Sequence, residues 1–359
     1  MSKLIVCMGT LLAGGAERVL CSLSTAFADA YDEVEYVMWL PSGVFYDLDP
    51  RVKVVSVVEE SGSNKRLLHA WWFRRKVKKE KPTMILSFMA MCNFIVTLSV
   101  LGLKCRVVVS ERNDPRFFKR GKRLRKFIYW LYARKNVKGV VMQTKPNKDF
   151  LPAFLQHKAA VIYNPVNIPE DTKGKGLRAQ KKDLVVSVGR LERQKGQDVL
   201  IRAFAKFHAK YPNYNLTIYG DGSKRARLQS LVKELGVEEH VSLPGRIKNV
   251  PEAIAPAKMF VLTSLYEGMS NALLEAMAIG IPCISTRVSG STDLITDHEN
   301  GLLTDVGDVD GIADAMGFIA SHPEEAHVYA VNAIQTMNNL ELSKISQTWI
   351  DYLRGFHED

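Results

Sequence analysis

Residues 259–279 read MFVLTSLYEGMSNALLEAMAI, and the order of apolar, turn and helix-forming residues in this stretch indicates how the chain folds. Met259 to Leu262 is a short apolar run that predicts a buried strand, whereas Ala272 to Ile279 has the composition of a buried helix. Gly268 lies between them and permits a tight turn. A strand that passes through a tight turn into a helix is the repeating unit of a parallel α/β sheet.

The start of this helix is a candidate phosphate site. Ser270 or Asn271 can cap the helix, and the backbone amides of its first turn then point toward the end of the strand. Glu275 is the one charged side chain on an otherwise apolar helix, and a buried carboxylate needs a polar partner. The two hydroxyl groups of a ribose would supply that partner, and a salt bridge with a neighbouring arginine is the alternative.

The same alternation of apolar runs and helix-length intervals extends over the whole chain. The strands expected in the first half are Leu4–Met8, Val34–Trp39, Val52–Val57, Met84–Phe88, Val107–Ser110 and Gly139–Gln143. Those expected in the second half are Asp183–Val188, Asn215–Tyr219, Val241–Leu243, Met259–Leu262 and Pro282–Thr286, with helices such as Gln197–Tyr211 between them. This pattern predicts parallel sheets with crossover helices in both halves.

A chain of 359 residues exceeds the usual size of a single hydrophobic core, and the polar run from Pro169 to Lys182 divides it. We expect a first Rossmann-like domain over residues 1–166 and a second over residues 183–340, joined by a linker over residues 167–182. Residues 341–359 are expected to form a C-terminal helix that crosses back to the first domain.

The composition, 47% apolar and 24% charged residues, is typical of a globular protein. No signal peptide is expected, because Lys3 is followed by only a short apolar run. Residues 84–103 lack charges and are long enough to span a bilayer, but we favour a buried strand followed by a buried helix from about Asn93 to Leu101. The five cysteines lie in apolar runs without CxxC pairs, which indicates reduced core residues in a cytoplasmic protein: Cys7, Cys21, Cys92, Cys105 and Cys283.

Positive charge is concentrated in two segments of a chain whose net charge is +11. Residues 65–81 hold eight Lys or Arg against one Glu, and residues 116–138 hold ten with no acid. Both segments also carry aromatic residues, a combination typical of helices at an anionic membrane surface. The alternative is that both are solvated helices whose aromatic side chains pack inward. We find no pattern of a nucleic-acid-binding module and expect no such partner.

Doubly wound sheets bind ligands at the carboxyl ends of their strands, so the loops that follow strands are the places to search. In residues 189–196, GRLERQKG, Arg190 offers a planar fork and Lys195 a point charge to a diphosphate, unless both are solvated surface residues. Glycine turns follow two further strands, at residues 220–222 (GDG) and 244–246 (PGR). The agreement of four strand-end loops in one domain predicts a ligand cleft.

The second half resembles the catalytic domain of family 4 glycosyltransferases of the GT-B fold. The matching features are the Glu-x7-Glu signature from Glu267 to Glu275, Gly189-Arg190 with Lys195-Gly196, Gly220-Asp221-Gly222 and Pro244-Gly245-Arg246. Gly14-Gly15-Ala16-Glu17 after the first strand matches too, so the resemblance covers nearly the whole chain. It implies an α/β architecture of two Rossmann-like domains that face each other across a cleft.

The resemblance also implies roles for individual residues. Glu275 would bind the ribose, Arg190 and Lys195 the donor diphosphate, and Glu267 would face the transferred sugar, so Arg190, Lys195 and Glu267 are the candidate catalytic residues. Family members retain the anomeric configuration and use no metal or other cofactor. The other implied donor-binding residues are Gly14, Gly15, Gly189, Gly220, Gly245, Arg246, Gly268, Met269, Ser270, Asn271 and Ala272.

One loop departs from the family pattern. Many relatives carry a histidine after the fifth strand, where this chain has Arg112 between Glu111 and Asn113. Arginine cannot act as a general base near neutral pH, so Arg112 would serve as a fixed cation or hydrogen-bond donor. We assign these three residues to the acceptor side.

These features lead us to expect a retaining transferase that moves a hexose or N-acetylhexosamine from UDP. The resemblance favours an undecaprenyl diphosphate-linked saccharide as the acceptor, in surface polysaccharide or glycan assembly at the inner face of the cell membrane. Three alternatives stay open: a GDP-mannose-dependent mannosyltransferase, a GT-B UDP-sugar 2-epimerase and a non-catalytic sensor of nucleotide sugars.

Overall fold

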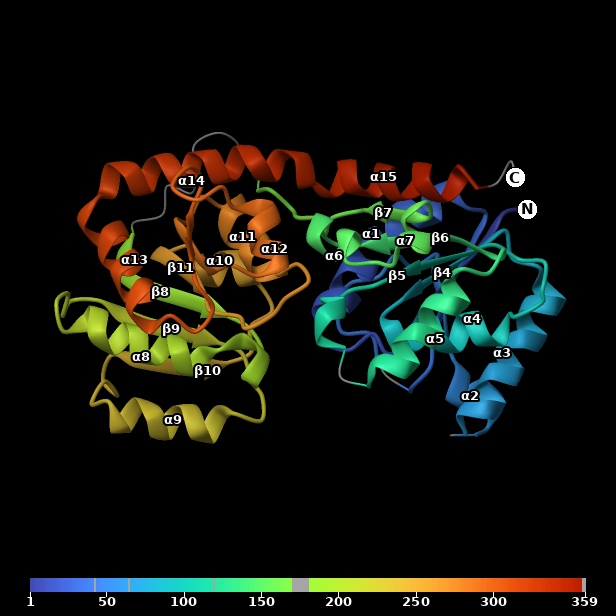
Figure 1. Cartoon of the computed structure of the whole chain (residues 1–359), viewed down its shortest axis with the longest axis horizontal. Coiled ribbons are helices and arrows are strands. Elements are labelled where there is room, and N and C mark those ends of the chain that lie inside the picture. Colours follow the sequence, from blue (N-terminus) through green and yellow to red (C-terminus); the bar gives the residue numbers. More distant parts are fainter. Residues whose placement is uncertain (42, 64, 119, 170–180, 357–359) are drawn as a thin grey trace. The chain divides into compact units, whose positions relative to one another are not determined.

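The structure is a computed structural model, and it describes residues 1–41, 43–63, 65–118, 120–169 and 181–356. The chain divides into two compact units, one formed by Met1–Pro165 with Leu342–Asp359 and one by Val166–Glu341 (Figure 1). Residues 170–180 of the expected linker lie outside the described residues.

The N-terminal unit is built on a parallel sheet with the strand order β3-β2-β1-β4-β5-β6-β7. Its strands are β1 (Lys3–Met8), β2 (Glu33–Met38), β3 (Lys53–Ser56), β4 (Met84–Phe88), β5 (Val107–Ser110), β6 (Val137–Met142) and β7 (Ala159–Val161). Its helices are α1 (Gly15–Ala30), α2 (Val57–Ser61), α3 (Arg66–Glu80), α4 (Ala90–Ser99), α5 (Lys122–Tyr132), α6 (Lys145–Asp149), α7 (Ala153–Gln156) and α15 (Leu342–Arg354), with the 3-10 turn η1 (Pro115–Phe117).

The last helix, α15, packs on this N-terminal unit (Figure 1). The Trp349 ring is fully buried and lies 5.6 Å from the ring of Phe88 in β4. The Tyr352 hydroxyl occupies the space that a Cβ on Gly139 of β6 would need, 2.2 Å from that position. The C-terminal helix therefore completes the core of the unit that contains the N-terminus, although about 180 residues separate it from that unit in sequence.

The C-terminal unit is built on a second parallel sheet, with the order β10-β9-β8-β11-β12-β13. Its strands are β8 (Lys182–Val188), β9 (Asn215–Tyr219), β10 (Val241–Gly245), β11 (Ala257–Leu262), β12 (Cys283–Thr286) and β13 (Leu302–Thr304). Its helices are α8 (Gln197–His208), α9 (Arg225–Glu234), α10 (Val250–Ile254), α11 (Asn271–Ala278), α12 (Ser289–Leu294), α13 (Val309–Ser321) and α14 (Pro323–Met337), with the 3-10 turns η3 (Arg193–Lys195) and η4 (Asn338–Leu340).

The two parallel sheets confirm the expected fold class. The strands β4, β5 and β9 have the predicted bounds, but β7 and β13 were missed. Each of these has three residues at the edge of its sheet and is only partly buried, so neither carries a hydrophobic pattern long enough to recognise.

The uncharged stretch of residues 84–103 forms β4 and α4, as we favoured. None of the helices among the described residues is long and apolar enough to cross a bilayer. Each described cysteine is a free thiol, and Cys105 alone among them is not fully buried.

Each sheet has one point at which the strand order reverses. In the N-terminal sheet it lies between β1 and β4, and in the C-terminal sheet between β8 and β11. Ligands of doubly wound sheets bind outside the carboxyl ends of the strands at such a point. The loops that follow β8 and β11 are therefore the place where the fold itself locates a site.

Candidate functional site

The loops that follow β8 and β11 are bonded to each other at the point where the strand order of the C-terminal sheet reverses. The Leu265 amide donates to the Gln194 carbonyl at 2.8 Å, and the Thr263 hydroxyl donates to the Gly196 carbonyl at 2.9 Å. Gly196 has a φ of +60°, and a Cβ there would lie 2.2 Å from the Thr263 carbonyl oxygen. Only glycine allows this approach.

Lys195 and Glu267 form an ion pair between these loops. The Lys195 ammonium lies 2.8 Å from Oε1 of Glu267, and the two side chains are only 12% and 11% exposed. The Gln194 amide donates to Oε2 of Glu267 at 3.2 Å and to the Tyr266 carbonyl at 3.0 Å. Both carboxylate oxygens of Glu267 therefore accept a hydrogen bond, which fixes the orientation of the carboxylate.

The helix that carries the signature begins directly after this pair. α11 starts at Asn271 with Ser270 as its N-cap, although the Ser270 side chain makes no capping hydrogen bond. Glu275 is buried, at 5% exposure, on a helix whose remaining central side chains are apolar and buried. The positive end of the helix dipole therefore lies beside Glu267, at the position expected for a phosphate site.

The start of α12 holds the turn between Glu267 and α11 in place. The Ser289 hydroxyl donates to the Glu267 carbonyl at 2.7 Å, and a Cβ on Gly290 would lie 2.1 Å from the Gly268 carbonyl oxygen. Sequence reasoning missed Ser289, Gly290 and the role of Gln194. Residues 289–290 lie just beyond the carboxyl end of β12. A search of the loop after this strand, as was made for the loops after other strands, would have found them.

The glycine turn after β9 packs against the loop after β8. Gly220 has a φ of +139°, and a Cβ there would lie 1.9 Å from the Gly189 carbonyl oxygen. The Gly220 amide donates to the Gly245 carbonyl at 2.7 Å. Gly245 is the last residue of β10, so this strand extends two residues beyond its predicted end at Leu243. Arg190 and Arg246 are exposed. The structure thus joins the glycines of the predicted site through backbone contacts and leaves these two arginines at the surface.

Gly14 and Gly15 lie in the N-terminal unit, at the start of α1 and after the carboxyl end of β1. This is the point where the strand order of that sheet reverses. Met89, which follows the neighbouring strand β4, has a φ of +78°, a conformation unusual for a residue with a side chain. Such backbone conformations cluster at functional sites, so the loop at Met89 is a further candidate for ligand contacts.

Arg112 is buried in the N-terminal unit rather than exposed to solvent. Its guanidinium donates to the Asn164 side chain and, at 3.3 Å, to the Ser110 hydroxyl, and it lies 4.7 Å from the centre of the Phe88 ring. Burial lowers the pKa of Arg112 to about 9, and no carboxylate within the described part of the chain forms an ion pair with it. Asn113 is exposed, so the predicted acceptor residues do not share one environment.

Glu111 is also buried, and the Tyr132 hydroxyl donates to its Oε1. Burial raises the pKa of Glu111, against the hydrogen bonds from Tyr132 and Asn93 that lower it. The Glu111 carboxyl group therefore holds its proton to a higher pH in the folded protein than in the unfolded chain.

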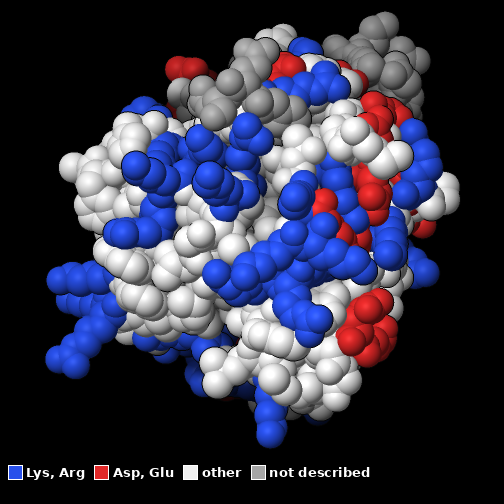
Figure 2. Space-filling model, turned by 90° about the vertical axis from the view of Figure 1, so that its right-hand side faces the viewer, with Lys and Arg blue, Asp and Glu red and all other residues white. Residues whose placement is uncertain are grey.

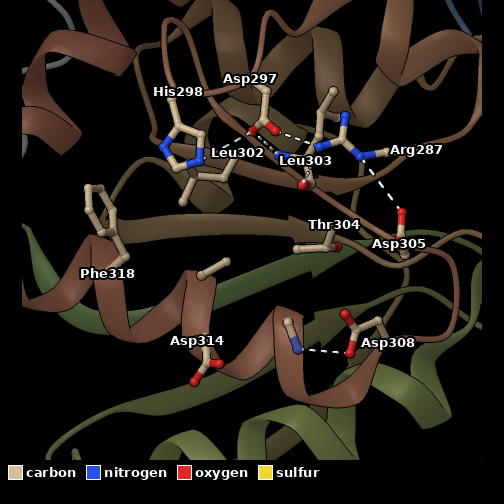
Figure 3. A pocket seen from close by; sticks show the side chains of 12 residues that line it. Arg287, Asp297, His298, Leu302, Leu303, Thr304, Asp305, Asp308, Asp314 and Phe318 are labelled. Atoms are coloured by element: carbon tan, nitrogen blue, oxygen red, sulfur yellow. Dashed lines mark hydrogen bonds and ion pairs between the residues drawn. The ribbon is translucent and has the colours of Figure 1, made fainter.

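A cavity of about 420 Å³ lies elsewhere in the C-terminal unit, beside β13 and α13 (Figure 3). Arg287 lines the cavity and forms ion pairs with Asp297 at 2.6 Å and Asp305 at 3.8 Å. Asp308, which also lines it, caps α13. None of the predicted donor-binding residues lines this cavity. It is separate from the loops described above.

Two Asp-x-Asp triplets occur in the sequence, at residues 47–49 and 308–310. In the described ranges, neither triplet belongs to a group of three or more His, Cys, Asp or Glu side chains placed to hold a metal ion.

Two doubly wound sheets, one of them with a cationic loop, a fixed carboxylate and a helix start where its strand order reverses, are the architecture of the GT-B class. The family model described as "Glycosyltransferase Family 4" matches residues 13–169, and the one described as "Glycosyl transferases group 1" matches residues 169–336. The chain belongs to the family 4 glycosyltransferases and is a hexosyltransferase.

Two relatives from Campylobacter jejuni match over the full length. The GalNAc-alpha-(1->4)-GalNAc-alpha-(1->3)-diNAcBac-PP-undecaprenol alpha-1,4-N-acetyl-D-galactosaminyltransferase is 27% identical over 98% of each chain. The N-acetylgalactosamine-N,N'-diacetylbacillosaminyl-diphospho-undecaprenol 4-alpha-N-acetylgalactosaminyltransferase is 27% identical over 99% of this chain and 100% of its own. Among solved structures, Anabaena HepE in complex with UDP and glucose matches with a TM-score of 0.81 at 19% identity, over 99% of this chain and 100% of its own. That likeness supports the fold.

The close contact at Gly290 leads to a prediction. Gly290→Ala should displace the turn at residues 267–269, because the added Cβ would collide with the Gly268 carbonyl. We expect destabilisation of about 1–3 kcal/mol and a fall in transfer rate of about tenfold or more. Thermal unfolding and initial rates would measure both. Gly317→Ala is the matched control, since a Cβ there meets only ordinary contacts, 3.6 Å away. Equal rates for the two variants would contradict the role of Gly290.

The buried carboxyl group of Glu111 leads to a second prediction. Since its pKa is raised, the folded protein binds more protons than the unfolded chain, and its stability should fall as pH rises from the ordinary carboxyl pKa to the raised one. Glu111→Gln removes this slope, so the stability of the variant relative to the parent should increase as pH rises above the ordinary carboxyl pKa of about 4.3. The exposed Glu60→Gln is the control. A constant difference across this range would show that Glu111 is not the titrating group.

Proposed function

We propose that the chain transfers a hexose or N-acetylhexosamine from UDP to a lipid-linked saccharide, with retention of the anomeric configuration and without a metal. The observation that carries this proposal is the Lys195–Glu267 pair beside the start of α11, at the point where the strand order reverses. The names of the Campylobacter relatives, which specify undecaprenol-linked acceptors, support the acceptor class. The UDP in the HepE complex supports the nucleotide.

The chemistry requires stabilisation of two charges that develop as the glycosyl phosphate bond breaks. Negative charge grows on the departing diphosphate, where Lys195, Arg190 and the amides at the start of α11 would neutralise it. Positive charge grows on the anomeric carbon, and the carboxylate of Glu267 would lie beside it. Because Lys195 pairs with Glu267 at 2.8 Å, one preorganised unit would serve both charges.

Retention requires the new bond to form on the face that the diphosphate leaves. A phosphate oxygen of the donor can then accept the proton of the acceptor hydroxyl, so no protein base is needed. Both oxygens of Glu267 accept hydrogen bonds, from Lys195 and Gln194, which makes this carboxylate a weak nucleophile. We therefore assign Glu267 an electrostatic and orienting role.

The proposal also includes the location of the enzyme, which would attach peripherally to the inner face of the cell membrane, where a lipid-linked acceptor is held. The basic segments of residues 65–81 and 116–138 would contact anionic lipid, and we expect no nucleic-acid partner. This location would bring the enzyme to a lipid-linked acceptor.

Release of free UDP, measured with and without a lipid-linked acceptor, tests the proposal. A transferase releases UDP in proportion to acceptor, an epimerase releases it or interconverts UDP-sugars without acceptor, and a sensor does neither. A thermal-shift screen of UDP- and GDP-linked sugars would identify the donor. Stabilisation by GDP-mannose alone would replace the UDP-sugar with the mannosyl donor.

A further inference from the structure

We propose that the exposed face of α5 is a docking face that enters the headgroup region of an anionic bilayer. The docking face consists of residues on one side of the helix, all of them exposed: Lys122, Arg123, Lys126, Phe127 and Trp130. The inference rests on the proposed lipid-linked acceptor and names the surface that would meet the membrane that holds it.

The apolar part of the docking face is a continuous aromatic cluster. Phe127 and Trp130 are each 42% exposed and stack with ring centres 5.5 Å apart and an interplanar angle of 14°. Phe94 of the adjacent helix α4 contacts Phe127 with ring centres 6.1 Å apart, and Leu98 of α4 is 37% exposed. The other side of α5 is already buried in the core through Ile128 and other side chains. An exposed aromatic cluster on a helix whose other side is already buried marks a surface for interaction.

The cationic part of the docking face determines which environment that is. Residues 116–138 contain no acid, and Lys122, Arg123 and Lys126 stand on the same exposed face as the two aromatic rings. The Arg134 guanidinium lies 3.8 Å from the Trp130 ring centre. Figure 2 shows Lys and Arg in broad fields separated by uncharged surface. Aromatic rings for the acyl boundary and cations for anionic headgroups, side by side, are typical of an interfacial helix.

The other basic segment has a different role. In α3, Lys76 pairs with the buried Glu35 at 2.6 Å, and Arg74 donates to the carbonyls of Ser99 and Leu101 at 3.0 and 2.8 Å. Two of its cations are therefore used in packing within the unit. Trp71 of α3 is also exposed, with the Arg75 guanidinium 4.6 Å from its ring centre, and Leu67 and Leu68 are exposed beside it. We infer that α5, where two stacked rings lie on the same face as three exposed cations, is the helix that inserts.

α5 is also bonded to the loop that we assign to the acceptor. The Tyr132 hydroxyl donates to Glu111, and the Arg125 guanidinium donates to the Pro115 carbonyl at 2.9 Å. The helix that docks thus contacts residues 111–115 at both ends of the segment. Docking through α5 would place this loop next to the headgroups, where a lipid-linked saccharide emerges.

The experiment compares vesicle binding by the full chain and by F127A/W130A. The vesicles contain equal parts of phosphatidylglycerol and phosphatidylcholine, and sedimentation is measured at low and high salt. The parent should keep part of its binding at high salt, and the double variant should bind about tenfold more weakly and lose the salt-resistant part. W71A, which removes an exposed tryptophan from α3, is the matched control and should stay within about twofold of the parent.

Equal binding by the parent and F127A/W130A, or an equal loss in W71A, would overturn the assignment to α5. A parent that ignores these vesicles but binds a single-stranded oligonucleotide would replace the bilayer with nucleic acid. Transfer to a water-soluble, short-chain acceptor separates this inference from the proposed function. The double variant should keep that activity and lose transfer to an acceptor embedded in vesicles, whereas a parent inactive on both acceptors would refute the transferase proposal and leave the vesicle result standing.

Discussion

Lys195→Ala should lower the rate of sugar transfer by roughly 10² or more, because it removes a preorganised charge from the leaving diphosphate. The sequence predicts an exposed loop for Lys195, and on that basis turnover should fall far more than stability. The structure changes this expectation, since the ammonium lies 2.8 Å from Glu267 and the lysine side chain is only 12% exposed. Its removal leaves a largely buried carboxylate without its cation, so we also expect a modest loss of stability.

Two further variants distinguish catalysis from packing at this pair. Arg193→Ala removes an exposed cation from the same turn and should leave the transfer rate unchanged. Lys195→Ala with Glu267→Gln should recover much of the lost stability, because no unpaired charge remains, but should recover no activity. Initial rates and thermal unfolding of the purified variants would measure these effects. Near-normal transfer by Lys195→Ala would remove Lys195 from the mechanism.

Glu275→Ala should weaken UDP binding by roughly 10², since hydrogen bonds to a charged group contribute about 1.5–3 kcal/mol each and a ribose offers two. Glu275→Gln keeps the shape of the side chain and should still lose most of this affinity, because the amide is a weaker acceptor. Calorimetric titration with UDP would measure both variants.

The control for Glu275 is Met277→Leu, a volume-conserving change at a fully buried position of the same helix. It should disturb the packing of α11 slightly and leave UDP affinity unchanged. If Met277→Leu and Glu275→Gln lost affinity alike, the effect would come from the helix rather than from the carboxylate.

Local patterns were sufficient for most of the fold. The runs that became β4, β5 and β9 are short, apolar and bounded by turn residues, and the helices between them set a parallel arrangement. The same patterns placed the candidate site, because a glycine turn after a strand is visible in sequence and the carboxyl ends of parallel strands meet at one edge of a sheet. They failed at β7 and β13, which are too short to show a period.

Local sequence patterns predicted the alternation of strands and helices, the positions of the strand-end loops, and a helix over residues 272–279 with a single carboxylate, Glu275; the observed helix covers residues 271–278. These features are local, since they depend on residues within one or two turns of each other. The pairing of Lys195 with Glu267, 72 residues away, and the support that Gly290 gives to the turn between Glu267 and α11 became visible in the folded chain alone. The tertiary structure also decided that Phe127 and Trp130 face outward, because burial depends on which distant elements cover a helix and no local pattern records that choice.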